Sequence, residues 1–232
     1  MTRLLYELCG KDQDQRFSLF AWRIRLALCQ KGLEFTGVPT TFLDKSAFAD
    51  SGAKTVPVLK DGGKWVADSW DIACYLEDTY PKAPSIFGGK TGRAYAKFFA
   101  NWAFAALHPR IFLLIAPDIA ECLGDEDRAY FLETRAERIG RPVESLTAER
   151  DKNFPVLKGV LQPLARTLSE QPFVSGDEPF YPDYVAFSVF QWARISSPLD
   201  LLEDEAGIEA WFSRMQDWYH ARITKLENPP LV

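Results

Sequence analysis

The segment TVPVLKDGGKWVADSW, residues 55–70, strongly limits what the first third of the chain can form. Two short apolar runs flank the four residues 61–64 (DGGK), a pattern typical of the tight turn of a β-hairpin. Pro57 lies inside the first run, and proline has no N–H to donate to a sheet ladder. We therefore expect a hairpin in which Pro57 lies at a sheet edge or at a bulge.

A strand–helix–strand pattern precedes this hairpin. The helix between the two strands begins with Ser18 as a candidate N-cap and stops at Gly32. The order of elements predicts a small sheet with helices on its faces, an α/β fold. The expected strands are 3–8, 33–40, about 56–60 and 64–67, and the expected helices are 18–31, 44–52 (short helix or turn) and 69–80.

The rest of the chain is predicted to be helical, after a stretch rich in Pro and Gly that is typical of a linker. We therefore divide the chain into an α/β domain at 1–82, a linker at 83–93 and an all-helical domain at 94–232. The candidate helices of the second domain are 91–116, 126–139, 154–170, 183–196 and 207–223.

The composition of the chain argues against several classes of function, namely nucleic-acid binding, membrane insertion and metal binding. The net charge of −5 provides no overall basic field for nucleic acid or an anionic membrane. The most apolar stretch, 98–117, is interrupted by polar residues and by Pro109, so we expect no membrane span. Four cysteines without a Cys-x-x-Cys pair and only two histidines predict no metal site. Reduced thiols favour a cytoplasmic location.

Four motifs together resemble the cytosolic glutathione transferases, most closely the bacterial β-etherase-type enzymes and related fungal proteins. They are TVPVL, ADSW, FSLFAWRIRLAL and PDYVAFSVFQWARI, the last with an early aspartate, Asp183. The resemblance covers nearly the whole chain. It implies a thioredoxin-like first domain, an all-helical second domain and a homodimer. The implied substrates are glutathione and a hydrophobic aromatic molecule.

The resemblance also implies a glutathione site. A cis bond between Val56 and Pro57 would let Val56 pair with the cysteinyl part of glutathione through its N–H and C=O groups. Ser69 and its helix N-terminus would bind the γ-glutamyl carboxylate, and Asp68 would bind the ammonium group. The plainer alternatives are an edge-strand proline and ordinary helix capping.

Two further regions complete this predicted site. Lys45 and Lys54 would contact the glycine carboxylate, although solvated surface lysines are the plainer interpretation. Ser18 matches the family's serine and would stabilise the glutathione thiolate by hydrogen bonding at a helix N-terminus. A plain N-cap is the alternative, and Leu19 replaces the proline that many relatives carry after this serine.

A second-substrate pocket is expected between the domains, where ligand sites are common. Cys9 offers an alternative to the mechanism with Ser18. If Cys9 were the reactive residue, the protein would be a thiol reductase. A third hypothesis is a non-catalytic carrier of hydrophobic aromatics. The residues expected to line the pocket are Cys9, Phe20, His108, Phe112 and Trp192.

Overall fold

The computed structural model describes residues 2–226. Its first part is a four-stranded sheet in the order β2-β1-β3-β4, in which only β1 and β2 are parallel. This arrangement confirms the α/β prediction. The elements are β1 (Arg3–Leu8), α1 (Leu19–Lys31), β2 (Thr36–Thr40), the 3₁₀ turn η1 (Ser46–Ser51), β3 (Val58–Asp61), β4 (Lys64–Ala67) and α2 (Ser69–Thr79).

The hairpin differs from the prediction at its first strand. β3 begins at Val58, so Pro57 precedes the ladder and removes no hydrogen bond from it. The turn places Gly62 at φ 59°, a left-handed conformation that glycine adopts without a Cβ clash. The predicted conflict between proline and a strand is therefore resolved by a later strand start.

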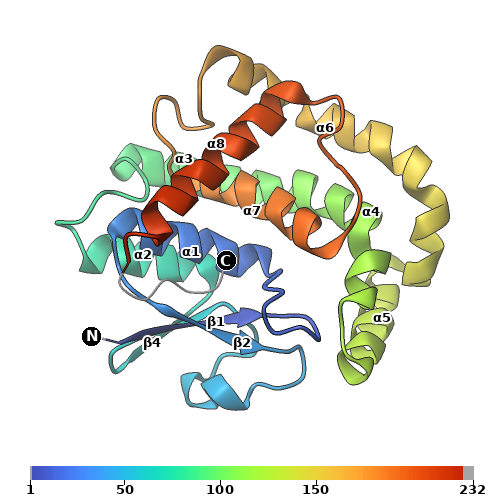
Figure 1. Ribbon diagram of the computed structural model, residues 1–232, viewed down its shortest axis with the longest axis horizontal. Helices are drawn as coiled ribbons and strands as arrows, with labels where there is room; N and C mark the ends of the chain where they lie inside the picture. Colours follow the sequence, from blue (N-terminus) through green and yellow to red (C-terminus); the bar gives the residue numbers. More distant parts are fainter. Residues whose placement is uncertain (1, 227–232) are drawn as a thin grey trace.

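Helix α1 is buried on all sides because it lies between the sheet and the helices of the second domain (Figure 1). Ser18 caps its start, and Gly32 ends it at φ 64°, as the sequence predicts. Trp22 extends into the second domain, with its ring 6.2 Å from Phe187 and 5.4 Å from Tyr219. The two domains thus share one hydrophobic core.

The second domain is helical in the described residues after the linker, as predicted. The expected helix 91–116 is three consecutive helical pieces: α3 (Lys90–Trp102), the π-helical turn η2 (Ala103–Leu107) and α4 (His108–Glu121). Pro109 lies directly after η2, where the π-helical turn already interrupts the regular hydrogen-bond ladder of the helix. Together these pieces have the length and composition of a membrane span, as do core helices of soluble proteins.

The remaining helices wrap around a central one, α7 (Figure 1). The carboxylate of Asp183, in the first turn of α7, is fully buried and accepts hydrogen bonds from the four donors Val174 N, Ser175 N, Phe180 N and Trp211 Nε1. It fixes the loop before α7 against α8. The helices are α5 (Asp125–Ile139), the 3₁₀ turn η3 (Val143–Glu149), α6 (Arg150–Glu170), α7 (Tyr181–Ser196) and α8 (Ala206–Ile223).

Candidate functional site

Ser18 lies where the loop after β1 enters α1. Its Oγ accepts a hydrogen bond from the Ala21 N–H at 3.3 Å, so Ser18 is the N-cap of the helix. A hydroxyl that accepts one hydrogen bond retains its own hydrogen to donate. The first-turn N–H groups beside it carry partial positive charge. This corner of the molecule is chemically suited to hold an anionic atom.

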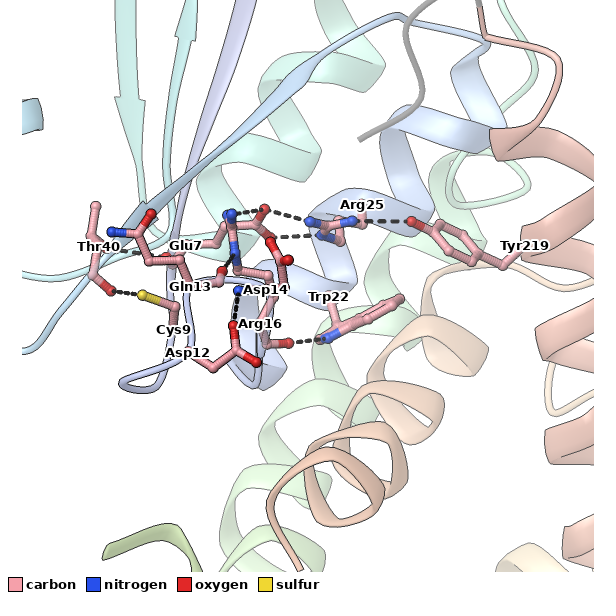
Figure 2. Close-up of polar contacts among 10 residues, drawn as sticks. All are labelled: Glu7, Cys9, Asp12, Gln13, Asp14, Arg16, Trp22, Arg25, Thr40 and Tyr219. Carbon is pink, nitrogen blue, oxygen red and sulfur yellow. Dashed lines mark hydrogen bonds and ion pairs between the residues drawn. The ribbon is translucent and has the colours of Figure 1, made fainter. Parts of the chain in front are cut away.

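A buried ion-pair network holds the loop that leads to Ser18 (Figure 2). Arg25 binds Glu7 in a bidentate manner, with Nε 2.7 Å from Oε2 and Nη2 2.5 Å from Oε1. Arg16, from the loop, adds a longer contact of 3.4 Å from Nη1 to Glu7 Oε1. Because all three side chains are buried, water does not screen these charges strongly.

The same network joins both domains. The indole Nε1 of Trp22 donates to the Arg16 carbonyl at 2.8 Å, which fastens the loop to α1. On the other side, Arg25 Nη1 contacts the Tyr219 hydroxyl of α8 at 3.3 Å (Figure 2). Sequence reasoning missed this network. A signal was present in the charged residues that interrupt the apolar helix 18–31, but the pattern does not name their partners.

Cys9 lies at the end of β1 and is almost fully buried. Its backbone N–H and its Sγ both donate to the Thr40 carbonyl, at 2.9 and 3.4 Å (Figure 2). Burial raises the pKa of the Cys9 thiol above its ordinary value, and the nearby Arg16 only partly offsets this effect. A protonated, enclosed thiol is a poor nucleophile, which weighs against the reductase hypothesis.

The start of α2 brings Asp68 and Ser69 together. The Asp68 carboxylate accepts hydrogen bonds from Trp70 N at 2.8 Å and Asp71 N at 3.3 Å, so the predicted helix cap is present. Asp68 also has φ 74°, a conformation that is uncommon outside glycine and often marks functional sites. Ser69 is buried, and its carbonyl accepts from the Tyr181 hydroxyl at 3.4 Å.

The peptide bond between Val56 and Pro57 is cis, as the resemblance implied. Among residues 2–226, no hydrogen bond involves the Val56 N–H or C=O. The backbone of Val56 is therefore available to pair with an extended ligand. Lys45 and Lys54 are both exposed, on either side of η1.

Four of the five residues expected in the second-substrate pocket lie together around His108. The imidazole stacks on Trp192 (centroids 5.1 Å apart) and on Phe104 (5.7 Å), with Phe112 at 6.5 Å. Phe20, from α1, approaches it at 6.3 Å. The His108 stack is our name for the five residues His108, Trp192, Phe104, Phe112 and Phe20. The four from the second domain come from η2, α4 and α7, so the stack spans the domain boundary close to Ser18.

Three more aromatic residues, missed from the sequence, extend the His108 stack back to Ser18. The ring centroids are 6.4 Å apart for Phe112 and Phe131, 5.9 Å for Phe131 and Phe42, and 6.5 Å for Phe42 and Phe17. Phe17 precedes Ser18, and Phe20 follows it by two residues.

A hollow of about 410 Å³ lies elsewhere, on the surface of α3. None of the residues predicted for the glutathione or second-substrate sites lines it. Two of its aromatic residues, Tyr95 and Phe98, are 69% and 71% exposed. The full lining is Phe87, Gly88, Gly92, Tyr95, Phe98, Phe99, Val174, Ser175, Phe180 and Pro182.

Similar proteins of known structure share this fold. A glutathione transferase from Phanerochaete chrysosporium superposes with a TM-score of 0.83 at 23% identity, over 96% of this chain and 97% of that one. A glutathione S-transferase of Ceriporiopsis subvermispora, solved in complex with glutathione, gives 0.82 at 22% identity, over 95% and 99%.

Sequence comparison identifies the family. A glutathione S-transferase-like protein of Aspergillus flavus is 27% identical over 138 residues, 55% of this chain and 50% of that protein. A zeta-class glutathione S-transferase of Euphorbia esula is 26% identical over 168 residues, 70% of this chain and 66% of that protein. The chain thus spans between half and two thirds of these relatives. Family models for the glutathione S-transferase N-terminal and C-terminal domains match residues 17–79 and 94–223, so the chain belongs to the glutathione S-transferase family.

Proposed function

We propose that this chain is a glutathione transferase in which Ser18 stabilises the thiolate of glutathione. The observation that carries the proposal is the position of Ser18 as the N-cap of α1, where its Oγ accepts from Ala21 N–H and, within residues 2–226, its own hydrogen is not used in a hydrogen bond. The free thiol has a pKa of roughly 8.5, so it needs such stabilisation to react near neutral pH. A donated hydrogen bond and a helix N-terminus both favour the charged form.

The glutathione contacts in this proposal are those that the family resemblance implies, and the arrangement of Val56 and of the start of α2 supports them. Val56 pairs with the cysteinyl residue through its unused N–H and C=O. The N-terminus of α2 and Ser69 receive the γ-glutamyl carboxylate, while Asp68 pairs with the ammonium group. Lys45 and Lys54, both exposed, meet the glycine carboxylate. Pro57 holds the turn that presents Val56.

The reaction proposed is nucleophilic substitution. The thiol proton is released to solvent as the thiolate forms, and the sulfur then attacks an electrophilic carbon of the aromatic substrate. A carbon–sulfur bond forms, and the bond to the leaving group breaks, so that the leaving group departs with the electron pair. The His108 stack is the proposed binding surface for this substrate, and Cys9, buried against Thr40, is not part of it. An aryl ether with a phenolate leaving group is one such substrate, as the β-etherase resemblance suggests.

Two other functions remain as alternatives. A non-catalytic carrier would bind the aromatic molecule and glutathione without turnover. A thiol reductase would depend on Cys9, whose burial and raised pKa disfavour it. Release of chloride from 4-chloro-3-nitrobenzamide in the presence of glutathione separates the transferase from the carrier. We also propose that the protein is cytoplasmic and forms a homodimer. Sedimentation velocity tests the oligomeric state.

Calorimetric titration of glutathione tests the proposed function directly. Wild type should bind glutathione, and Asp68→Asn should weaken binding about tenfold, because asparagine keeps the helix cap but loses the charge that pairs with the ammonium group. Asp71→Asn, which removes the same charge from the same helix turn, is the matched control and should change affinity less than twofold. Absence of binding to wild type at millimolar glutathione would contradict the assignments of Val56, Asp68 and Ser69.

A further inference from the structure

The His108 stack is surrounded by positive charge, although the chain as a whole carries a net charge of −5. Arg23 of α1 lies beneath Phe20, with its Cζ 4.7 Å from the ring centroid. Its side chain is only 4% exposed. Nε donates to Ser188 Oγ at 3.3 Å, while Nη2 is buried without a hydrogen-bond partner. Burial lowers the pKa of the Arg23 guanidinium, and the nearby Tyr181 and Asp68 partly offset this effect.

A second guanidinium lies at the opposite end of the aromatic rings. Arg135 of α5 is half-buried, with its Cζ 5.1 Å from the centroid of Phe131 and 5.4 Å from that of Phe42. Its Nη1 donates to Thr134 Oγ1 at 2.9 Å. Arg138 follows about one turn later on the same helix. Arginines of α1 and of α5 therefore lie at the two ends of this row of aromatic rings.

The carboxylate of Asp68 acts on Arg23 without contacting it directly. Within residues 2–226, neither Arg23 nor Arg135 nor Arg138 forms an ion pair with a carboxylate. By contrast, Arg128, on the same helix α5, pairs with Glu121 at 2.6 Å. Burial, and after it the positive charges of Arg23, Arg138 and Arg135, lowers the pKa of His108 to about 4. His108 is therefore neutral at pH 7.

We propose that the second substrate is an aromatic carboxylate, whose ring packs against the His108 stack and whose carboxylate is bound by Arg135 and Arg138, with Arg23 adding positive potential from below. The inference rests on the proposed function, since it names the class of molecule that the transferase would accept. The reason is complementarity. A carboxylate would supply the ion-pair partner that Arg135 and Arg138 lack among residues 2–226, and a planar guanidinium binds a carboxylate with good geometry.

A matched pair of ligands tests this inference. 4-Chloro-3-nitrobenzoate and 4-chloro-3-nitrobenzamide have nearly the same shape and differ in charge. We expect wild type, titrated calorimetrically at low salt without glutathione, to bind the benzoate about tenfold more tightly than the benzamide. This preference should shrink as salt rises from about 0.01 to 0.15 M, because the Debye length falls from roughly 30 to 8 Å.

Substitutions assign the preference to individual residues. Arg135→Gln should reduce the benzoate preference to about twofold while leaving benzamide affinity nearly unchanged. Arg135→Lys keeps the charge but loses the planar guanidinium, so it should retain only part of the preference. Arg128→Gln removes the same charge from the same helix and is the matched control. Equal affinity of wild type for both ligands, binding of neither, or an equal loss in Arg128→Gln would overturn the proposal.

The histidine provides a second readout that does not depend on turnover. The chain has only two histidines, so the His220→Gln variant leaves His108 as the one imidazole in an NMR titration. The pKa of His108 should be about 4 in the free protein and should rise when the benzoate binds, because a nearby negative charge favours the imidazolium. The benzamide should not raise it, and a pKa that does not respond to the benzoate would contradict the proposal.

The two proposals fail in different ways. Absence of glutathione binding would contradict the proposed transferase. The benzoate and benzamide titrations contain no glutathione, so they report on the arginines in either case.

Discussion

Ser18→Ala is expected to lower kcat/KM for the reaction of glutathione with 4-chloro-3-nitrobenzamide about a hundredfold near pH 7. Removing one positioned donor to a developing or full anion typically costs 10²–10³ in rate, about 2.7–4 kcal/mol. The pKa of the bound thiol should rise toward the free value of roughly 8.5. The deficit should therefore shrink above pH 9, where the thiolate forms without help. Thiolate absorbance near 240 nm across pH, combined with steady-state kinetics, measures both effects.

The same variant also loses a helix cap, so stability must be followed in parallel. Loss of the cap is expected to cost about 1 kcal/mol of unfolding free energy, which leaves the protein folded. Ser169→Ala is the matched control, because Ser169 Oγ donates to a backbone carbonyl at the exposed end of α6 and should affect neither rate nor pKa. If Ser18→Ala retained full activity while Cys9→Ala abolished it, the thiol reductase hypothesis would replace the proposed mechanism.

Arg25→Met is expected to reduce the free energy of unfolding by about 3–5 kcal/mol. The change leaves the buried Glu7 carboxylate without its bidentate partner, and an uncompensated buried charge is costly. It also removes the contact to Tyr219 that joins the first domain to α8. Urea denaturation followed by tryptophan fluorescence measures the loss.

Two comparisons isolate the role of burial. Arg128→Met breaks an exposed ion pair with Glu121 and should cost no more than about 1 kcal/mol. The double variant Glu7→Leu/Arg25→Met removes both charges and should recover a substantial part of the loss. A cost for Arg25→Met no larger than that for Arg128→Met would show that the network contributes little to stability.

Local signals in the sequence predicted much of the fold and part of the candidate site. The starts of α1 and α2 at Ser18 and Asp68, and the end of α1 at Gly32, follow from capping chemistry that acts within one helical turn. The hairpin around 61–64 follows from turn chemistry in the same way. These residues could be identified because their partners lie a few positions away in the chain.

Other expectations changed because the backbone had options that the pattern did not reveal. Pro57 precedes β3, so the strand never has to accommodate it. The helix expected at 91–116 continues through a π-helical turn and ends at Glu121. In the apolar stretch 98–117, Phe98 and Phe104 are more than half exposed. An apolar pattern does not show which face of a helix a neighbour will cover.

The sequence by itself determined the order of elements, the helix caps, the hairpin turn and the family motifs, because each depends on residues close together in the chain. Only the tertiary structure decided which charged and aromatic side chains meet. Glu7 and Arg25 pair because β1 packs under α1, and Arg135 reaches the rings near Ser18 because α5 folds back beside the loop that contains Phe42. Such contacts depend on how distant segments pack, and the polarity or size of one residue does not specify its partner.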